Sequence, residues 1–300
     1  MEVARPSTSA AKAGESALKQ TSEWRRTLRL FRQNQGAVVG AVVFTLIVLI
    51  AIFAPALAPY DPAAQDPVNS LTGPSLSHPF GFDNLGRDVF SRVIEGSRQS
   101  LLVGLIAIGI AVTLGTLIGL LTGYYEGWID TVFQRLIDIL LAFPGLLLSL
   151  TIVAVLGPGL RNAMIAVGIS LIPSYARMVR GSVLSAKHAA YVESARTIGC
   201  RDGRVIFRHV LPNVAVPILV LSTIGFAWSI LIGASLSFLG LGAQPPAPEW
   251  GRDLSDGRNY LSIAWWIATF PGLAIMLTIL SINLVGDGLR DALDPRLRTR

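Results

Sequence analysis

Residues that could carry out catalysis or bind a metal are few and widely separated in this sequence. The three histidines, His78, His188 and His209, are scattered, and Cys200 is the single cysteine, so no disulfide or cysteine-based metal cluster can form within the chain. The G-x-x-x-x-G-K-S/T loop that binds nucleotide phosphates is absent, as are the H-E-x-x-H and G-x-S-x-G motifs. The sequence therefore predicts no catalytic site, no metal and no cofactor.

One carboxylate, Asp138, falls in a long apolar stretch, where an ionisable residue is by default a candidate for function. Arg135 precedes it by three residues and would lie on the same face of a helix. Both lie near the end of the stretch. The residues alone leave two interpretations open, a gate within the membrane and a structural or water-exposed ion pair.

Apolar runs dominate the composition. Hydrophobic residues make up 52% of the chain and charged residues 15%, against about 25% charged residues in an ordinary globular domain. The net charge of +6 raises the possibility of nucleic acid binding, but the basic residues fall between apolar runs instead of forming one surface. We therefore expect a lipid bilayer, and no nucleic acid, as the surroundings of this chain.

Charge-free stretches predict six transmembrane helices, because about 20 apolar residues are needed to cross the hydrocarbon layer. The fourth is the weakest, since its charge-free part is only about 15 residues long. Pro144 and Pro173 fall inside spans and should kink them. The predicted fold is an all-α integral membrane protein, with spans at residues 36–57, 99–124, 139–156 (starting nearer to 132), 162–176, 213–241 and 263–285.

The distribution of lysine and arginine predicts the orientation. Apart from Arg135, eighteen of these residues flank the spans on one side and six on the other, and the richer side is normally cytoplasmic. Both termini and the loop before the fifth span should therefore be cytoplasmic. The predicted organisation is a tail at 1–35 with a short amphipathic helix at 24–31, a first span at 36–57, an outer loop at 58–98, a five-helix core at 99–287 and a tail at 288–300.

A long polar loop, AAYVESARTIGCRDGRVIFRHVLPNVAVP, joins the fourth and fifth spans. Val192, Ala195 and Ile198 recur every three residues, which predicts a short helix with one apolar face. Gly199 then permits a sharp turn, and Asp202 can cap a second short helix. Two such helices would project below the membrane as a knuckle. They could insert into a groove on another protein, or only seal the bundle.

The segment at 188–210 and the residues after it resemble the cytoplasmic signature of permeases from ATP-binding-cassette (ABC) importers. That signature is E-A-A, then glycine after three residues, then L-P; here it reads ESA at 193–195, G at 199 and LP at 211–212. The resemblance implies that the helix docks into a cleft on an ATPase subunit and transmits its closure to the spans. The residues implied in this coupling are Tyr191, Glu193, Ser194, Ala195, Gly199, Arg204, His209, Leu211 and Pro212.

Three further stretches resemble the second permease subunit of importers of the dipeptide, oligopeptide and nickel type. They are HPFGFDNLGRDVFSRVIEGSRQSL at 78–101, SFLGLGAQPPAPEWG at 237–251 and LVGDGLRDALDPR at 284–296, and the likeness covers nearly all of the chain after about Arg29. Phe82 replaces the polar residue usual in this family. In the first stretch, Gly86, Arg87 and Asp88 could pair internally or contact a substrate-delivering partner.

The resemblance implies a type I ABC importer permease fold that forms half of a pathway for di- or oligopeptides across a bacterial cytoplasmic (inner) membrane. Its implied partners are a second homologous permease subunit, two ATPase subunits and an extracytoplasmic substrate-binding protein. The alternative is an ion-coupled secondary transporter that uses Asp138. Such transporters usually place ionisable residues near the midplane, so one carboxylate near the end of a span fits poorly. A membrane-embedded enzyme would lack catalytic groups, and the cargo is not identified by any residue.

Overall fold

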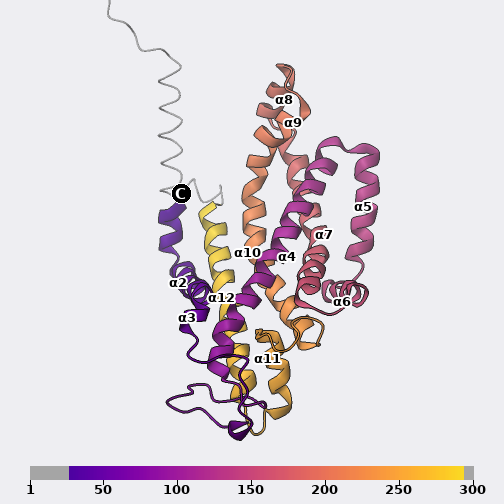
Figure 1. The fold of residues 1–300 in the computed structure, drawn as a ribbon. Coiled ribbons are helices and arrows are strands. Elements are labelled where there is room, and N and C mark those ends of the chain that lie inside the picture. The colour runs from indigo at the N-terminus through magenta and orange to yellow at the C-terminus, as the bar shows by residue number, and fades with distance from the viewer. Residues whose placement is uncertain (1–26, 294–300) are drawn as a thin grey trace, which may run out of the picture.

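The computed structural model describes residues 27–293, and regular structure in this part of the chain is helical (Figure 1). An isolated β-bridge joins Phe82 and Asp88. Residues 27–33 are helical, whereas the start of the predicted amphipathic helix, residues 24–26, lies outside the described chain. The labelled elements are α2 (Gln35–Ile52), α3 (Ala54–Leu57), η1 (Pro67–Asn69), α4 (Val89–Tyr125), α5 (Gly127–Leu141), α6 (Gly145–Leu156), α7 (Leu160–Ala186), α8 (Ala190–Thr197), α9 (Asp202–Val205), the π-helical turn η2 (Ile206–Val210), α10 (Leu211–Phe238), α11 (Trp250–Gly257), η3 (Arg258–Tyr260) and α12 (Trp266–Leu293).

Five helical stretches in the described chain are long and apolar enough to cross a membrane: α2, α4, α7, α9 through α10, and α12. The predicted third span is different, because α5 and α6 meet at an angle of 94° and form a bent pair. Pro144 lies at this bend, where it cannot donate a backbone hydrogen bond and disfavours helix at the residue before it. The expected kink is therefore a complete break, and six spans are reached only if the bent pair is one of them.

The fourth predicted span is longer than its charge-free part. Helix α7 continues through Arg177 and Arg180, because both guanidinium groups are neutralised by carboxylates of α5. Arg180 binds Asp130 through two hydrogen bonds of 2.6 Å each, and Arg177 forms an ion pair with Asp138. Helix α7 therefore extends beyond the charge-free part predicted at 162–176, since a paired charge does not terminate a helix.

Helices α4 and α7 pack closely against each other through glycine. Three glycines of α4, spaced four residues apart, face three larger side chains of α7. A Cβ added at these positions would lie 2.4, 2.6 and 2.8 Å from the Cβ of the facing residue. Such close approach of two helix backbones is typical of small-residue stripes in membrane proteins. The facing pairs are Gly115 with Tyr175, Gly119 with Val179 and Gly123 with Val183.

Different segments of the chain lie at the two ends of the molecule. Residues 27–33 and the end of α12 lie in the half of the molecule that holds α8 and α9 (Figure 1). Residues 58–88 and α11 lie at the opposite end (Figure 1). Helix α4 has 37 residues, about 55 Å at 1.5 Å per residue, which exceeds the hydrocarbon thickness. It therefore connects the two ends.

Candidate functional site

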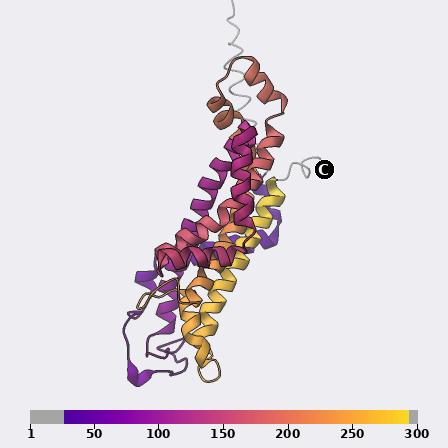
Figure 2. The same cartoon turned by 90° about the vertical axis from the view of Figure 1, so that its right-hand side faces the viewer.

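Two short helices, α8 and α9, project beyond the long helices at one end of the molecule (Figure 2). This arrangement matches the predicted knuckle, and we use that name for residues 188–210. Gly199 separates the two helices with φ of +82°, a conformation that favours glycine. No atom lies within 4 Å of a Cβ added there, so the backbone angle and not crowding requires the glycine.

The base of the knuckle is an apolar cluster shared with the long helices. Val192 and Val205 have no exposed surface, and Ala195 is 5% exposed. They pack in one cluster with the ends of α4 and α7 and with the start of α10, and Leu211 packs against that cluster. The resemblance implied a role for Ala195 in coupling to the ATPase. Its side chain lies on the same apolar face as Val192 and packs against the long helices.

Tyr124, near the end of α4, joins both helices of the knuckle. Its hydroxyl donates a 2.7 Å hydrogen bond to the carboxylate of Asp202 at the start of α9. The guanidinium carbon of Arg196, on α8, lies 4.9 Å from the centre of the Tyr124 ring. The carboxylate of Asp202 was expected to cap the second helix, but Arg201 holds the cap position and Asp202 binds Tyr124.

An ion pair also joins two of the long helices at the base of the knuckle. Lys187, which follows α7, pairs with Glu126, which follows α4. Burial is the main cause that lowers the pKa of the Lys187 amine, and the nearby positive charge of Arg196 lowers it further. The ends of α4 and α7 are thus joined to each other and to the knuckle by polar as well as apolar contacts.

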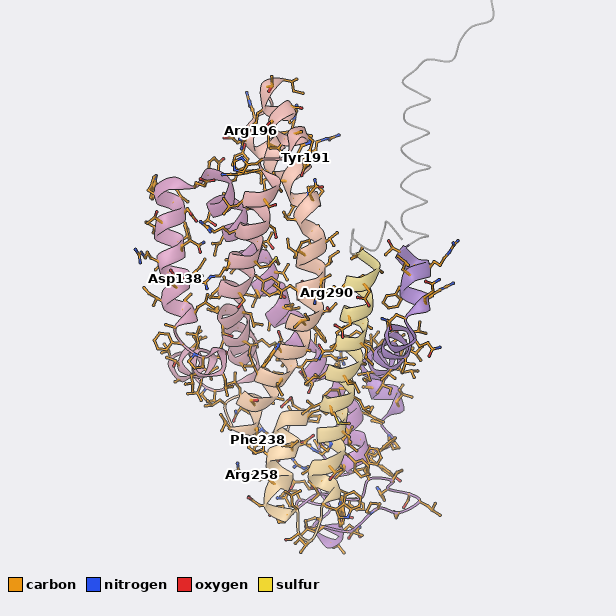
Figure 3. All side chains as sticks on the ribbon, turned by 180° about the vertical axis from the view of Figure 1, so that it is seen from behind. Asp138, Tyr191, Arg196, Phe238, Arg258 and Arg290 are labelled. Atoms are coloured by element: carbon orange, nitrogen blue, oxygen red, sulfur yellow. The ribbon has the colours of Figure 1, made fainter. Side chains whose placement is uncertain are left out.

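The outward surface of the knuckle, which we call the knuckle tip, is partly apolar. Ile198 and Phe207 are 80% and 61% exposed, and Tyr191 is 43% exposed. Apolar side chains this exposed on a projecting segment are characteristic of an interaction surface. The tip consists of Tyr191, Glu193, Ser194, Ile198, Gly199, Arg204 and Phe207, all of which are exposed; Tyr191 is labelled in Figure 3.

The sequence interpretation placed two of these residues incorrectly or not at all. Ile198 was assigned to the apolar face of the helix with Val192 and Ala195, but α8 ends at Thr197 and Ile198 turns outward. Phe207 was missed, although an aromatic residue among charged ones in a polar loop is a usable signal. Of the other implied residues, Pro212 is exposed and His209 is half-buried, with its carbonyl accepting a 2.7 Å hydrogen bond from Asn213.

Asp138 and Arg135, for which the sequence left a gate or an ion pair open, do not pair with each other. Asp138 pairs across helices with Arg177, and Arg135 has no ion pair with any residue in the range 27–293. Both members of the observed pair are more than half exposed. A long arginine on a neighbouring helix reaches the carboxylate as readily as one three residues away, and sequence spacing gives no sign of it.

Gly86, Arg87 and Asp88, the motif before α4, make contacts within the chain. Arg87 is 4% exposed and binds Asp83 and Asp256, and Asp88 is 3% exposed. The carboxylate of Asp88 accepts hydrogen bonds from the backbone N–H of Ser91, at 2.7 Å, and lies 2.9 Å from a ring nitrogen of His78. Gly86 has φ of +72°, and a Cβ there would lie 1.9 Å from a backbone oxygen.

A buried carboxyl fixes α11 on α4 at the same end. Glu249 is 1% exposed and accepts hydrogen bonds from the backbone N–H groups of Gly251 and Arg252 in the first turn of α11. It also accepts one from Ser100 of α4, at 3.0 Å. Burial raises the pKa of Glu249, although these hydrogen bonds oppose the shift. Among residues 27–293, no group of three or more histidine, cysteine or acidic side chains could hold a metal.

Comparison with known proteins assigns this arrangement to a family. Residues 115–299 match the family described as binding-protein-dependent transport system inner membrane component. Residues 22–74 match the N-terminal transmembrane domain of oligopeptide transport permease C.

Curated relatives match over nearly their whole length. The chain is 47% identical to the dipeptide transport system permease protein DppC of Alkalihalophilus pseudofirmus, over 95% of this chain and 94% of that protein. It is 50% identical to the glutathione transport system permease protein GsiD of Escherichia coli O157:H7, over 92% of this chain and 91% of that protein.

A solved structure of the MetNI methionine ABC transporter in inward-facing conformations has a similar fold. It superposes with a TM-score of 0.54 and 19% sequence identity, over 68% of this chain and 98% of that one. The likeness supports the predicted all-α, type I ABC importer permease fold. The chain belongs to the family of binding-protein-dependent transport system inner membrane components.

Proposed function

We propose that this chain is the membrane-spanning permease subunit of a peptide importer. The knuckle binds a separate ATPase subunit and transmits its movement to the long helices. One observation carries the proposal: the knuckle has an exposed apolar tip and a base joined to three long helices. The relatives named for dipeptide and glutathione transport support short peptides as the cargo class, because glutathione is itself a short peptide.

The contacts of the base suggest how a movement of the tip would reach the membrane. Helix α9 continues through η2 into α10 with no intervening loop, so α10 would follow the knuckle directly. Tyr124 ties the knuckle to α4, and the glycine-mediated packing holds α7 to α4. The bundle would then switch between two arrangements, biased by whether the ATPase cleft is closed.

The charge distribution supports an orientation and a set of partners. The end that holds the knuckle, residues 27–33 and the end of α12 is the lysine- and arginine-rich end, and we assign it to the cytoplasm. Two ATPase subunits would dock there, one on this chain and one on a second homologous permease. A substrate-binding protein would dock at the opposite end, where residues 58–88 and α11 lie.

Two charge substitutions in the knuckle tip test the proposal. Ile198→Asp and Phe207→Asp should abolish co-purification of the ATPase subunits from native membranes, because each places a charge in an apolar contact. Leu76→Asp is the matched control, since Leu76 is fully exposed at the opposite end. Retention of the second permease by all variants would show that they fold. ATPase subunits that stay bound to both tip variants would contradict the proposal, as would a wild-type chain that purifies alone.

A further inference from the structure

An apolar cleft opens in the half of the molecule that holds α11. Its volume is about 460 Å³, and side chains of α6, α10, α11 and α12 line it. Its lining includes the large apolar side chains of Leu146, Leu231, Phe238, Leu254 and Ile275. Ser235, the polar side chain among its lining residues, already donates a hydrogen bond to the carbonyl of Leu231. The cleft therefore suits an apolar group and has the size of a small-molecule site.

An arginine contacts one of the residues that line this cleft. The guanidinium carbon of Arg258, in η3, lies 5.2 Å from the centre of the Phe238 ring, and Phe238 also lines the cleft. Figure 3 shows the two labelled residues next to each other at the α11 end. A guanidinium group that stacks on an aromatic face keeps its N–H edge free, and that edge matches a carboxylate.

Arg258 differs from three other arginines at this end of the molecule. Arg87, Arg92 and Arg252 are each paired with an aspartate. Arg258 is exposed and has no carboxylate within ion-pair distance among residues 27–293. An unpaired arginine that stacks on an aromatic ring of an apolar cleft has the chemistry to bind an anion that carries an apolar group.

We propose that this cleft receives the C-terminal residue of a peptide. The free carboxylate binds the guanidinium group of Arg258, and the apolar side chain of the same residue enters the cleft against Phe238 and Leu254. The inference rests on the proposed importer function and names a substrate contact for it. It predicts that the permease itself prefers a free C-terminus to an amidated one.

Photo-crosslinking tests the inference in the purified transporter complex without its binding protein, so that selection by the binding protein does not enter. The probe is the dipeptide alanyl-leucine with a diazirine on the leucine side chain. We expect labelling of cleft residues, located by mass spectrometry. Unlabelled alanyl-leucine should compete at least tenfold better than alanyl-leucine amide.

The variants isolate the contribution of the arginine. Arg258→Gln should reduce labelling about tenfold and remove the preference for the free acid, while Arg258→Lys restores part of both. Phe238→Leu keeps the cleft apolar but removes the stacking, and an intermediate loss is expected. Arg161→Gln is the matched control: Arg161 is also exposed and unpaired within residues 27–293, and it should label like the wild type.

Three results would overturn the inference: labelling unaffected by Arg258→Gln, equal competition by acid and amide, or labelling outside the cleft. A photoactivatable phospholipid that labels the cleft while the dipeptide does not would assign the site to lipid, and would also overturn it. In each case, peptide uptake and ATPase co-purification by the wild type would leave the proposed function standing. Loss of those two properties in the wild type would contradict the proposed function itself.

Discussion

At the scale of single residues, Tyr124 illustrates how a spanning helix is joined to the knuckle. Its ring and its hydroxyl make separate contacts, with Arg196 and with Asp202. No sequence pattern predicts this contact, because Tyr124 and Asp202 are 78 residues apart. Gly199 was predictable by contrast, since the need for a sharp turn between two short helices is a local property.

Removing only the hydroxyl of Tyr124 should loosen the knuckle without disturbing the ring contact. Tyr124→Phe loses a hydrogen bond to a carboxylate, and we expect a loss of about 1–2 kcal/mol in the local stability of the knuckle. Hydrogen exchange of α9 amides measures this, and transport per ATP hydrolysed should fall. Tyr125→Phe is the control, because Tyr125 is 47% exposed. Equal exchange rates in both variants would show that the hydrogen bond has no role.

Glu249 should make stability depend on pH. Burial raises its pKa above the ordinary value of 4.5, so the folded state binds more protons than the unfolded state between that value and the folded pKa. Stability contributed by this group should fall as pH rises through that window and level off above it. Glu249→Gln keeps an acceptor for the start of α11 and should show a smaller fall in thermal midpoint. Glu95→Gln, on half-buried Glu95, should keep the wild-type profile.

At the scale of elements, hydropathy predicted the existence of the helices better than their ends. The start of α4 was missed by ten residues, because the expected start at Gln99 ignored the cap that Asp88 provides. The α7 end was missed because Arg177 and Arg180 are neutralised from another helix. The break at Pro144 was anticipated as a kink, but its 94° angle depends on tertiary packing.

The glycines of α4 that face α7 should not tolerate side chains, whereas a glycine of α4 that faces open space should. A Cβ at Gly119 would lie 2.7 Å from the carbonyl oxygen of Ala176, a backbone atom that cannot move alone. Gly119→Ala should therefore destabilise the protein by about 1–3 kcal/mol despite the better helix propensity of alanine. Gly109→Ala on the same helix is the control, since nothing lies within 4 Å of its Cβ. Thermal unfolding in detergent compares them, and equal midpoints would refute the packing argument.

At the scale of the whole molecule, the knuckle tip and the cleft lie at opposite ends of a connected set of helices. Helix α10 reaches both, because it follows η2 at one end and provides Phe238 to the cleft at the other. Family resemblance identified one motif in the knuckle and others in the loops at the opposite end. The connection between them required the structure, since it depends on which long helices are neighbours.

Closure of the ATPase should therefore change the access of reagents to the cleft. In the double variant Cys200→Ser, Leu254→Cys, the rate of reaction with a maleimide should change several-fold after nucleotide trapping with ATP and vanadate. Phe207→Asp should abolish this change, because the tip would no longer follow the ATPase. A cysteine at Leu76, fully exposed, should react equally in both states. A change at position 254 that persists in the Phe207→Asp background would mean that another surface transmits the movement, and α10 would lose its assigned role.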